Sequence, residues 1–187
     1  MKQKLLCGIY FSLFLLTSYS GNSQDIKFER VSEAPPATQI FEGVEDSSIA
    51  FADVNGDTFQ DVLITGFVAN FGPMSTLYTN NGSGVFTEVT TPFERVEYGS
   101  IAFADVNRDT YPDLLMTGKN NFGQTISKLY TNNGSGVFTE VTTPFEWVMN
   151  SSIAFSDING DTYQDVLITG YNRVTRQATS KLYTNNG

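Results

Sequence analysis

The chain has 187 residues, a net charge of −9 and no histidine, and its only cysteine is Cys7. Zinc sites, Ser-His-Asp triads and Cys-His pairs are therefore excluded, which leaves carboxylates, Lys, Tyr, Ser and Thr as possible catalysts. The sequence has no basic patch, which argues against nucleic acid as a partner, and its 13% aromatic residues and 16 glycines are typical of an extracellular β protein.

Residues 1–24 are typical of a secretory signal peptide. Lys2 and Lys4 precede an apolar stretch from Leu5 to Leu16, which small and polar residues follow. This stretch is too short for a membrane-spanning helix, and we expect processing between Ser20 and Gln24. The cysteine precedes the apolar centre, which argues against a lipoprotein anchor. We predict a secreted or cell-surface protein that has no cysteine in its mature form.

Residues 25–48 lead into the main part of the chain. The segment DIKFERV, at 25–31, is similar to the later GVFTEV segments and predicts an outer strand. Residues 32–48, with Pro35 and Pro36, predict a linker.

One stretch of sixteen residues occurs three times. It runs from Phe51 to Gly66 as FADVNGDTFQDVLITG and returns from Phe103 and Phe155, at a spacing of 52 residues. Apolar runs on both sides of its polar centre predict strands. The segment LYTNNGSGVFTEV, further along each of the first two copies, predicts two more strands joined by a tight Asn-Gly turn. Each repeat thus predicts four antiparallel strands.

The polar centre of each copy sets side-chain oxygens at alternate positions of a short loop. Asp, Asn, Asp and Asp occupy positions one, three, five and nine, and position seven would offer its backbone carbonyl. Calcium accepts six to eight oxygens of these kinds at about 2.3 to 2.6 Å. We therefore predict three Ca2+ sites, with the ligands Asp53, Asn55, Asp57, Phe59 and Asp61; Asp105, Asn107, Asp109, Tyr111 and Asp113; and Asp157, Asn159, Asp161, Tyr163 and Asp165.

The main alternative is that these residues only make good turns, because Asp, Asn and Gly favour turn conformations. Against this, all three copies keep the four side-chain ligands even where other loop positions change. An EF-hand fits worse, because it needs Glu at position twelve and Gly at position six. Position twelve is Ile64 in the first copy, and position six is Thr in every copy. A β-branched residue is costly there if φ is positive.

The pattern SIAFADVNGDTFQDVLITG followed by LYTNNGSGVFTEV resembles the FG-GAP and VCBS repeats of integrin-like β-propellers, and the resemblance covers nearly all of the chain after residue 24. It implies calcium loops between the first two strands of each blade. It also implies an all-β fold of four-stranded antiparallel blades, with repeats at 49–100, 101–152 and 153–187. The third repeat stops before its last strand. Because rings usually have four to eight blades, we expect further blades in cis or by self-association.

The connections vary while the strands and loops are kept, so any recognition is expected there. Candidate contact residues are Phe71, Phe122, Tyr171, Arg173 and Arg176. We predict an adhesion or ligand-binding scaffold for an unidentified protein or glycan. The alternative is the non-catalytic propeller portion of a larger secreted polysaccharide-active enzyme. Catalysis by the chain itself is not expected, because its only clustered carboxylates are the same in all three repeats.

Overall fold

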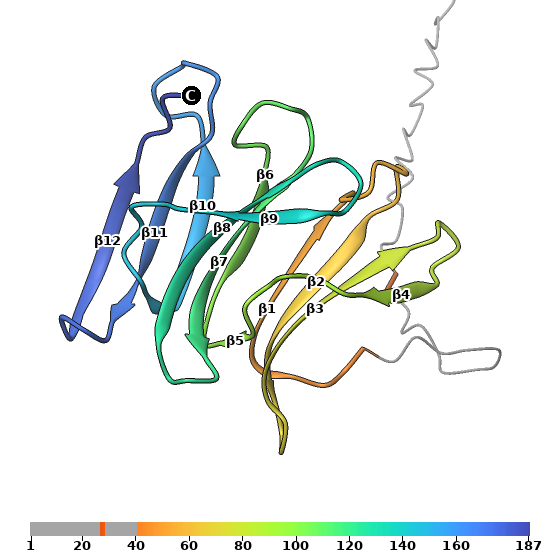
Figure 1. Cartoon of the computed structure of the whole chain (residues 1–187), viewed down its shortest axis with the longest axis horizontal. Coiled ribbons are helices and arrows are strands. Elements are labelled where there is room, and N and C mark those ends of the chain that lie inside the picture. The colour runs from red at the N-terminus through yellow and green to blue at the C-terminus, as the bar shows by residue number, and fades with distance from the viewer. Residues whose placement is uncertain (1–26, 29–40) are drawn as a thin grey trace, which may run out of the picture.

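The computed structural model describes residues 27–28 and 41–187 of the chain. The predicted signal peptide and most of the predicted outer strand and linker lie outside these residues. The described part is all-β, with twelve strands and no helix (Figure 1). It therefore holds no helix that could span a membrane.

The strands fall into three successive antiparallel units, which follow the repeats of the sequence. Unit 1 holds β1 (Glu45–Ala52), β2 (Asp61–Val68), β3 (Gly72–Asn80) and β4 (Phe86–Val89). Unit 2 holds β6 (Ile101–Ala104), β7 (Asp113–Asn120), β8 (Thr125–Asn132) and β9 (Phe138–Val141). Unit 3 holds β10 (Met149–Ser156), β11 (Asp165–Asn172) and β12 (Gln177–Tyr183). The predicted order of strands is confirmed, although β1 begins four residues before the predicted start of the first repeat.

The strand registers recur with the sequence. Val62 pairs with Tyr78 in unit 1, Leu114 with Tyr130 in unit 2, and Val166 with Tyr183 in unit 3. A short strand that the sequence did not predict, β5 (Val96–Glu97), pairs with both β3 and β7. It joins units 1 and 2 into one nine-stranded sheet, while unit 3 forms a separate three-stranded sheet.

The core lies between the units, which pack face to face along the molecule (Figure 1). Leu63 of unit 1 is buried in one cluster with Leu114 and Met116 of unit 2, while Leu115 of unit 2 is buried with Val166 of unit 3. A middle strand such as β7 is therefore apolar on both faces, as strands covered on both sides are. Alternate side chains of one strand thus hold two neighbouring units.

The outer faces of the first and last units are covered only in part. On unit 1, Val62, Ile64 and Tyr78 are buried in a cluster of their own, against which Val44, Met74 and Phe86 pack. Leu63 and Leu115 are fully buried, but the equivalent Leu167 of unit 3 is 42% exposed. Ile101 of unit 2 is 6% exposed, whereas the equivalent Ile49 of unit 1 is 57% exposed. Ile49 and Leu167 are thus exposed at the two ends of the series, although their equivalents inside it are buried.

Candidate metal centre

Each predicted metal loop connects the first two strands of a unit, as the sequence predicts. Residues 53–60 join β1 to β2, residues 105–112 join β6 to β7, and residues 157–164 join β10 to β11. The pairing of these strands holds the two ends of each loop together. Nine residues are thereby bent into one tight curl that begins and ends on aspartate.

The side chains of the first loop bind its own backbone. Oδ1 of Asp53 accepts hydrogen bonds from the N–H groups of Gly56 (2.8 Å) and Asp57 (3.1 Å), and Oδ2 accepts from Thr58 N–H (2.7 Å). Asp57 accepts from Phe59 N–H (2.9 Å) and from the Asn55 amide (2.9 Å). The other two loops repeat the bonds between positions three and five and from position six to position one. The residue pattern therefore dictates one loop conformation three times.

The aspartate at position nine is buried beneath each loop. Asp61 is fully buried, and its carboxylate accepts from Val54 N–H (3.0 Å) and Asn80 N–H (2.8 Å). Desolvation raises the pKa of Asp61; the two backbone hydrogen bonds lower it, and the charges of Asp57 and Asp53 add to the rise. The pKa of Asp113 is raised by the same causes in the same order. In both loops the buried aspartate thus lies within reach of the charges of the two outer carboxylates.

In the third loop the pKa of the aspartate at position one is shifted in the opposite direction. The pKa of Asp157 is lowered, chiefly by the hydrogen bond from Thr162 N–H. The first position of this loop is therefore stabilised in its charged form by the loop backbone.

The oxygen donors are of the type that calcium binds, but their side chains do not converge. Within residues 27–28 and 41–187, no three His, Cys, Asp or Glu side chains are grouped closely enough to hold a metal ion. The hydrogen bonds explain this, because Asp57 is held by Asn55 and by Phe59 N–H. Ion binding would have to replace those bonds. Calcium thus remains a prediction that rests on donor type, loop shape and the mutual effect of the carboxylates.

Position six carries backbone strain in all three loops. Thr58, Thr110 and Thr162 have φ values of 75°, 76° and 75°, in the left-handed region that β-branched residues rarely adopt. Position four is also left-handed, and there Arg108 (φ 65°) stands where the other loops have Gly56 (φ 77°) and Gly160 (φ 80°). The steric problem that the sequence suggested at position six is therefore present.

Replacing the three threonines by glycine is expected to stabilise the protein. Glycine removes the cost of the left-handed conformation, about 1 to 2 kcal/mol per site. It also loses more conformational entropy on folding, which offsets part of this gain. We therefore expect the free energy of unfolding to rise by about 0.5 to 1 kcal/mol per loop. Urea unfolding of Thr58→Gly, Thr110→Gly and Thr162→Gly measures this gain. Thr87→Gly, in exposed strand β4 without positive φ, should instead lose stability. A loss at the loop sites as well would show that the threonine side chains outweigh the strain.

The aromatic residue at position seven packs on the hairpin turn of its own unit. A Cβ on Gly82 would overlap the ring of Phe59, and one on Gly134 would overlap the ring of Tyr111. The Asn-Gly turns predicted from the sequence therefore support the loops predicted to bind metal, because the position-seven ring of each loop packs on the turn.

Gly82→Ala is expected to destabilise the protein by about 2 to 4 kcal/mol, because alanine adds a clash to a left-handed backbone. Gly84→Ala is the matched control: its φ is +76° against +78° for Gly82, and no atom lies within 4 Å of an added Cβ. This control should cost only about 1 kcal/mol. Equal losses, measured by chemical unfolding, would mean that the ring contact contributes nothing.

One contact between units was missed by sequence reasoning. The Asn132 side chain, 2% exposed, donates from its amide to the carbonyl of Val54 (2.9 Å), 78 positions earlier. Asn185 makes the equivalent bond to the Val106 carbonyl (2.7 Å). The turn of one unit therefore holds the metal loop of the preceding unit. The sequence indicates this contact only by the recurrence of LYTN, which by itself predicts no more than a strand that leads into a turn.

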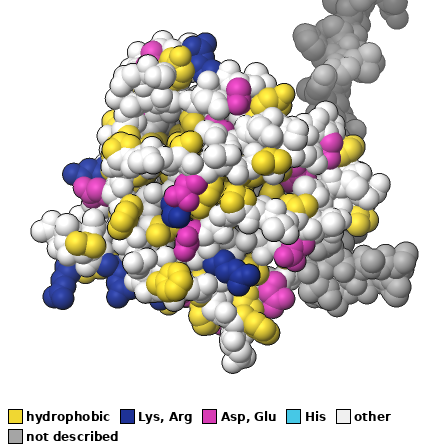
Figure 2. Space-filling view, in the orientation of Figure 1, with side chains coloured by type: hydrophobic (Ala, Val, Ile, Leu, Met, Phe, Trp, Pro, Cys, Tyr) yellow, Lys and Arg dark blue, Asp and Glu magenta, His cyan; other side chains and the backbone are white. Residues whose placement is uncertain are grey.

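The variable connections lie at the surface beside pockets. Phe71 and Phe122 are each 83% exposed, and they line pockets of about 630 and 420 Å³ on units 1 and 2. Arg173 donates to the Gly123 carbonyl (2.7 Å) and so links unit 3 to the connection in unit 2. Tyr171 is partly exposed, and Arg176 has a positive φ of 57°. On the face shown in Figure 2, acidic and basic side chains are interspersed with apolar ones.

Comparison with protein-family models and with curated proteins finds no match to this sequence.

Proposed function

We propose that the chain is a secreted calcium-binding repeat protein of the β-propeller type. It would serve as a scaffold for adhesion or ligand binding at a cell surface or in the medium. The observation that carries the proposal is the threefold recurrence of one tight loop with the same carboxylates. The last aspartate of each loop, such as Asp113, is buried beneath it.

In this proposal the carboxylates, the position-three amide and the position-seven carbonyl of each loop hold one calcium ion. The ion would supply two positive charges to the loop. Asp61 has a pKa raised chiefly by burial, and the nearby charges of Asp57 and Asp53 add to that rise. Calcium would thus fix the junction between two strands and, through Asn132, the contact to the next unit.

The proposed propeller is supported by the way in which the units stack. Successive units bury equivalent residues against each other, with Leu63 and Leu115 at equivalent places in two interfaces. Blades of a propeller pack in this manner around an axis. We infer that the three units are blades of a larger ring, completed by further repeats or by a second copy.

The alternative function is the non-catalytic propeller portion of a larger polysaccharide-active enzyme. Two acidic residues at equivalent places outside the loops have lysine partners, which favours a role without turnover for them. Glu94 pairs with Lys128 (3.3 Å), and Glu146, in the same place one unit later, pairs with Lys181 (3.5 Å). A carboxylic acid that acts as a general acid would instead need surroundings that raise its pKa and that the equivalent residues of the other units do not share.

Direct calcium binding tests the proposal. Isothermal titration of the metal-free chain should give three ions per chain, one for each loop. The triple variant Asp57→Ala, Asp109→Ala and Asp161→Ala should bind none, whereas Glu88→Ala, an exposed acid outside the loops, should still bind three. Failure of the unaltered chain to bind calcium at millimolar concentrations would remove the metal part of the proposal.

A further inference from the structure

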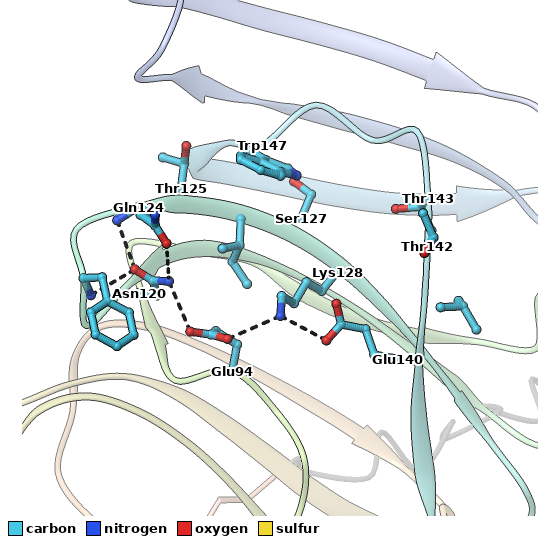
Figure 3. A pocket seen from close by; sticks show the side chains of 13 residues that line it. Glu94, Asn120, Gln124, Thr125, Ser127, Lys128, Glu140, Thr142, Thr143 and Trp147 are labelled. Atoms are coloured by element: carbon cyan, nitrogen blue, oxygen red, sulfur yellow. Dashed lines mark hydrogen bonds and ion pairs between the residues drawn. The ribbon is translucent and has the colours of Figure 1, made fainter.

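A pocket of about 420 Å³ lies on unit 2, beside the half of β8 that β9 leaves uncovered (Figure 3). β9 pairs only with Leu129–Asn132 of β8. The preceding residues of β8 have a single bridge at their outer edge, from Ile126 to Val148. The chain between β9 and β10 arches over this edge and carries Trp147 to the rim of the pocket (Figure 3).

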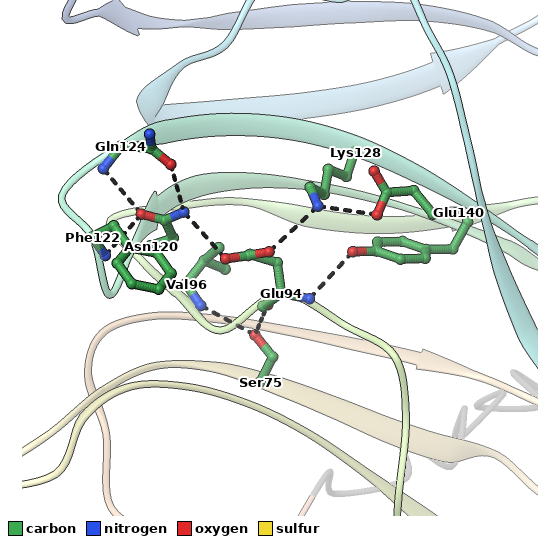
Figure 4. A network of polar contacts seen from close by, with 9 residues as sticks. Ser75, Glu94, Val96, Asn120, Phe122, Gln124, Lys128 and Glu140 are labelled. Atoms are coloured by element: carbon green, nitrogen blue, oxygen red, sulfur yellow. Dashed lines mark hydrogen bonds and ion pairs between the residues drawn. The ribbon is translucent and has the colours of Figure 1, made fainter.

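One side of the pocket is a row of polar groups fixed by their mutual bonds (Figure 4). Lys128 Nζ donates to Glu94 Oε2 (3.3 Å) and to Glu140 Oε2 (3.0 Å). The Asn120 amide donates to Glu94 Oε1 (3.1 Å) and to Gln124 Oε1 (3.4 Å). Asn120 is 4% exposed, and its carbonyl accepts from two backbone N–H groups of the Phe122 connection. Its role is to hold the row in place.

The outer members of this row keep capacity for a ligand. Lys128 has three N–H donors and uses two of them, and each carboxylate oxygen has more than one lone pair. The side chain of Glu140 is half exposed, and those of Glu94 and Lys128 are about one quarter exposed. Donors and acceptors thus alternate along one wall and remain open to a bound molecule.

The opposite side offers an aromatic face. Trp147 is 58% exposed and lies over β8 beside Thr125 and Ser127 (Figure 3). Phe122, at the end of the pocket, is 83% exposed. Large aromatic side chains with a polar group nearby are typical of binding surfaces. Trp147 stands across from the polar row, whereas Phe122 lies beside Asn120 at one end of it (Figure 4).

We propose that this pocket binds a neutral hexose unit of a glycan. Sugar hydroxyls both donate and accept hydrogen bonds, as the alternating row of carboxylates and ammonium requires, and the C–H face of a pyranose ring stacks on an aromatic face. Two carboxylates beside one lysine disfavour a phosphate or another anion, and the lysine disfavours a cation. The inference rests on the proposed ligand-binding scaffold and names the ligand class.

Unit 1 supplies a natural comparison. Its equivalent pocket has Arg95 in the place of Trp147 and Thr76 in the place of Lys128, while Glu42 and Glu88 occupy the places of the two glutamates. Of these two pockets, only the one on unit 2 therefore has a tryptophan and a lysine ammonium. The same backbone accepts both sets of side chains, so exchanging them should leave the fold intact.

The test uses the fact that the chain has one tryptophan. Trp147 fluorescence of the purified chain is titrated with a panel of neutral glucose, galactose and mannose trisaccharides, with inorganic phosphate and a uronic acid trisaccharide as anionic controls. At least one neutral sugar should give a saturable change, and the anions should bind at least about tenfold more weakly. Lys128→Thr, which installs the unit 1 residue, should weaken binding by about tenfold or more.

Two further variants separate the pocket from the fold and from the metal loops. Trp147→Arg, followed by calorimetry, should abolish sugar binding, while Phe71→Ala on unit 1 should leave it unchanged. Calcium binding is measured on the same samples. If calcium binds in the expected ratio but no neutral sugar does, or if Trp147→Arg binds sugar as well as the unaltered chain, the pocket inference is overturned and the calcium scaffold stands. Sugar binding without calcium binding would support the pocket and contradict the metal proposal.

Discussion

Calcium is expected to raise the melting temperature of this protein by tens of degrees. A ligand that binds only the folded state adds about 2.7 kcal/mol per site at a hundredfold excess over its Kd. Three filled loops would thus add about 8 kcal/mol, which for a chain of this size corresponds to a shift of about 15 to 30 °C. Thermal unfolding followed by circular dichroism, with added calcium and with a chelator, measures the shift.

The variants for this experiment follow from the loop geometry. Asp57 is exposed and bonded within its own loop, so the triple change of Asp57, Asp109 and Asp161 to Ala should alter metal-free stability by only about 0.5 kcal/mol per site. It should nevertheless remove the calcium response.

Asp113→Ala should instead lower the stability of the metal-free protein markedly. It leaves the N–H groups of Val106 and Asn132 without their acceptor, at about 1 to 3 kcal/mol each whether or not calcium is present. If the unaltered chain melts at the same temperature with calcium and with chelator, the loops act as turns alone.

The strand order and the loops could be predicted because their signals are local. Apolar runs on both sides of the polar centre of FADVNGDTFQDVLITG indicate two strands, and Asn-Gly at residues 81–82 indicates a hairpin; both are features of a few adjacent residues. The positive φ at Thr58 could be suspected for the same reason, since steric cost depends on one residue and its neighbours.

The contacts between units could not be predicted from local pattern. Asn132 reaches a carbonyl 78 positions away, and Glu94 meets Lys128 across 34 positions, so only the folded chain brings these groups together. Trp147 offered no period or motif, and its place beside the pocket depends on how the connection crosses β8. Strand β5 could not be predicted, because two residues are too few to show an alternating pattern.

The exposure of residues at the two ends of the series could not be predicted from local sequence either. Leu115 and Leu167 occupy the same place in nearly identical sequences, yet one is fully buried and the other is 42% exposed. No local rule distinguishes them, because the difference lies in whether another unit packs on that face. The exposed residues at the two ends are, however, complementary in kind. Leu167 corresponds to Leu115, which packs toward unit 3, and Ile49 corresponds to Ile101, which packs toward unit 1.

The chain without residues 1–24 is accordingly expected to associate head to tail in solution. Exposed apolar faces of this kind favour association, and joining the unit 3 face of one copy to the unit 1 face of another would repeat the contact already made within the chain. Such a heterologous contact closes into a ring or grows into a filament. Size-exclusion chromatography with light scattering should show a mass that rises with concentration.

Charged substitutions at the two ends test the direction of this contact. Ile49→Lys with Phe51→Lys places charge on the open face of unit 1, and Leu167→Lys with Leu182→Lys does so on unit 3, at residues that are all more than 40% exposed. Each double variant alone should be monomeric, since one of the two faces is blocked. A mixture of the two should form a one-to-one dimer, because the open unit 3 face of one variant can still meet the open unit 1 face of the other. Association of either variant with itself would instead indicate a symmetric contact between like faces, and a monomeric unaltered chain at all concentrations would show that neither face is used between copies.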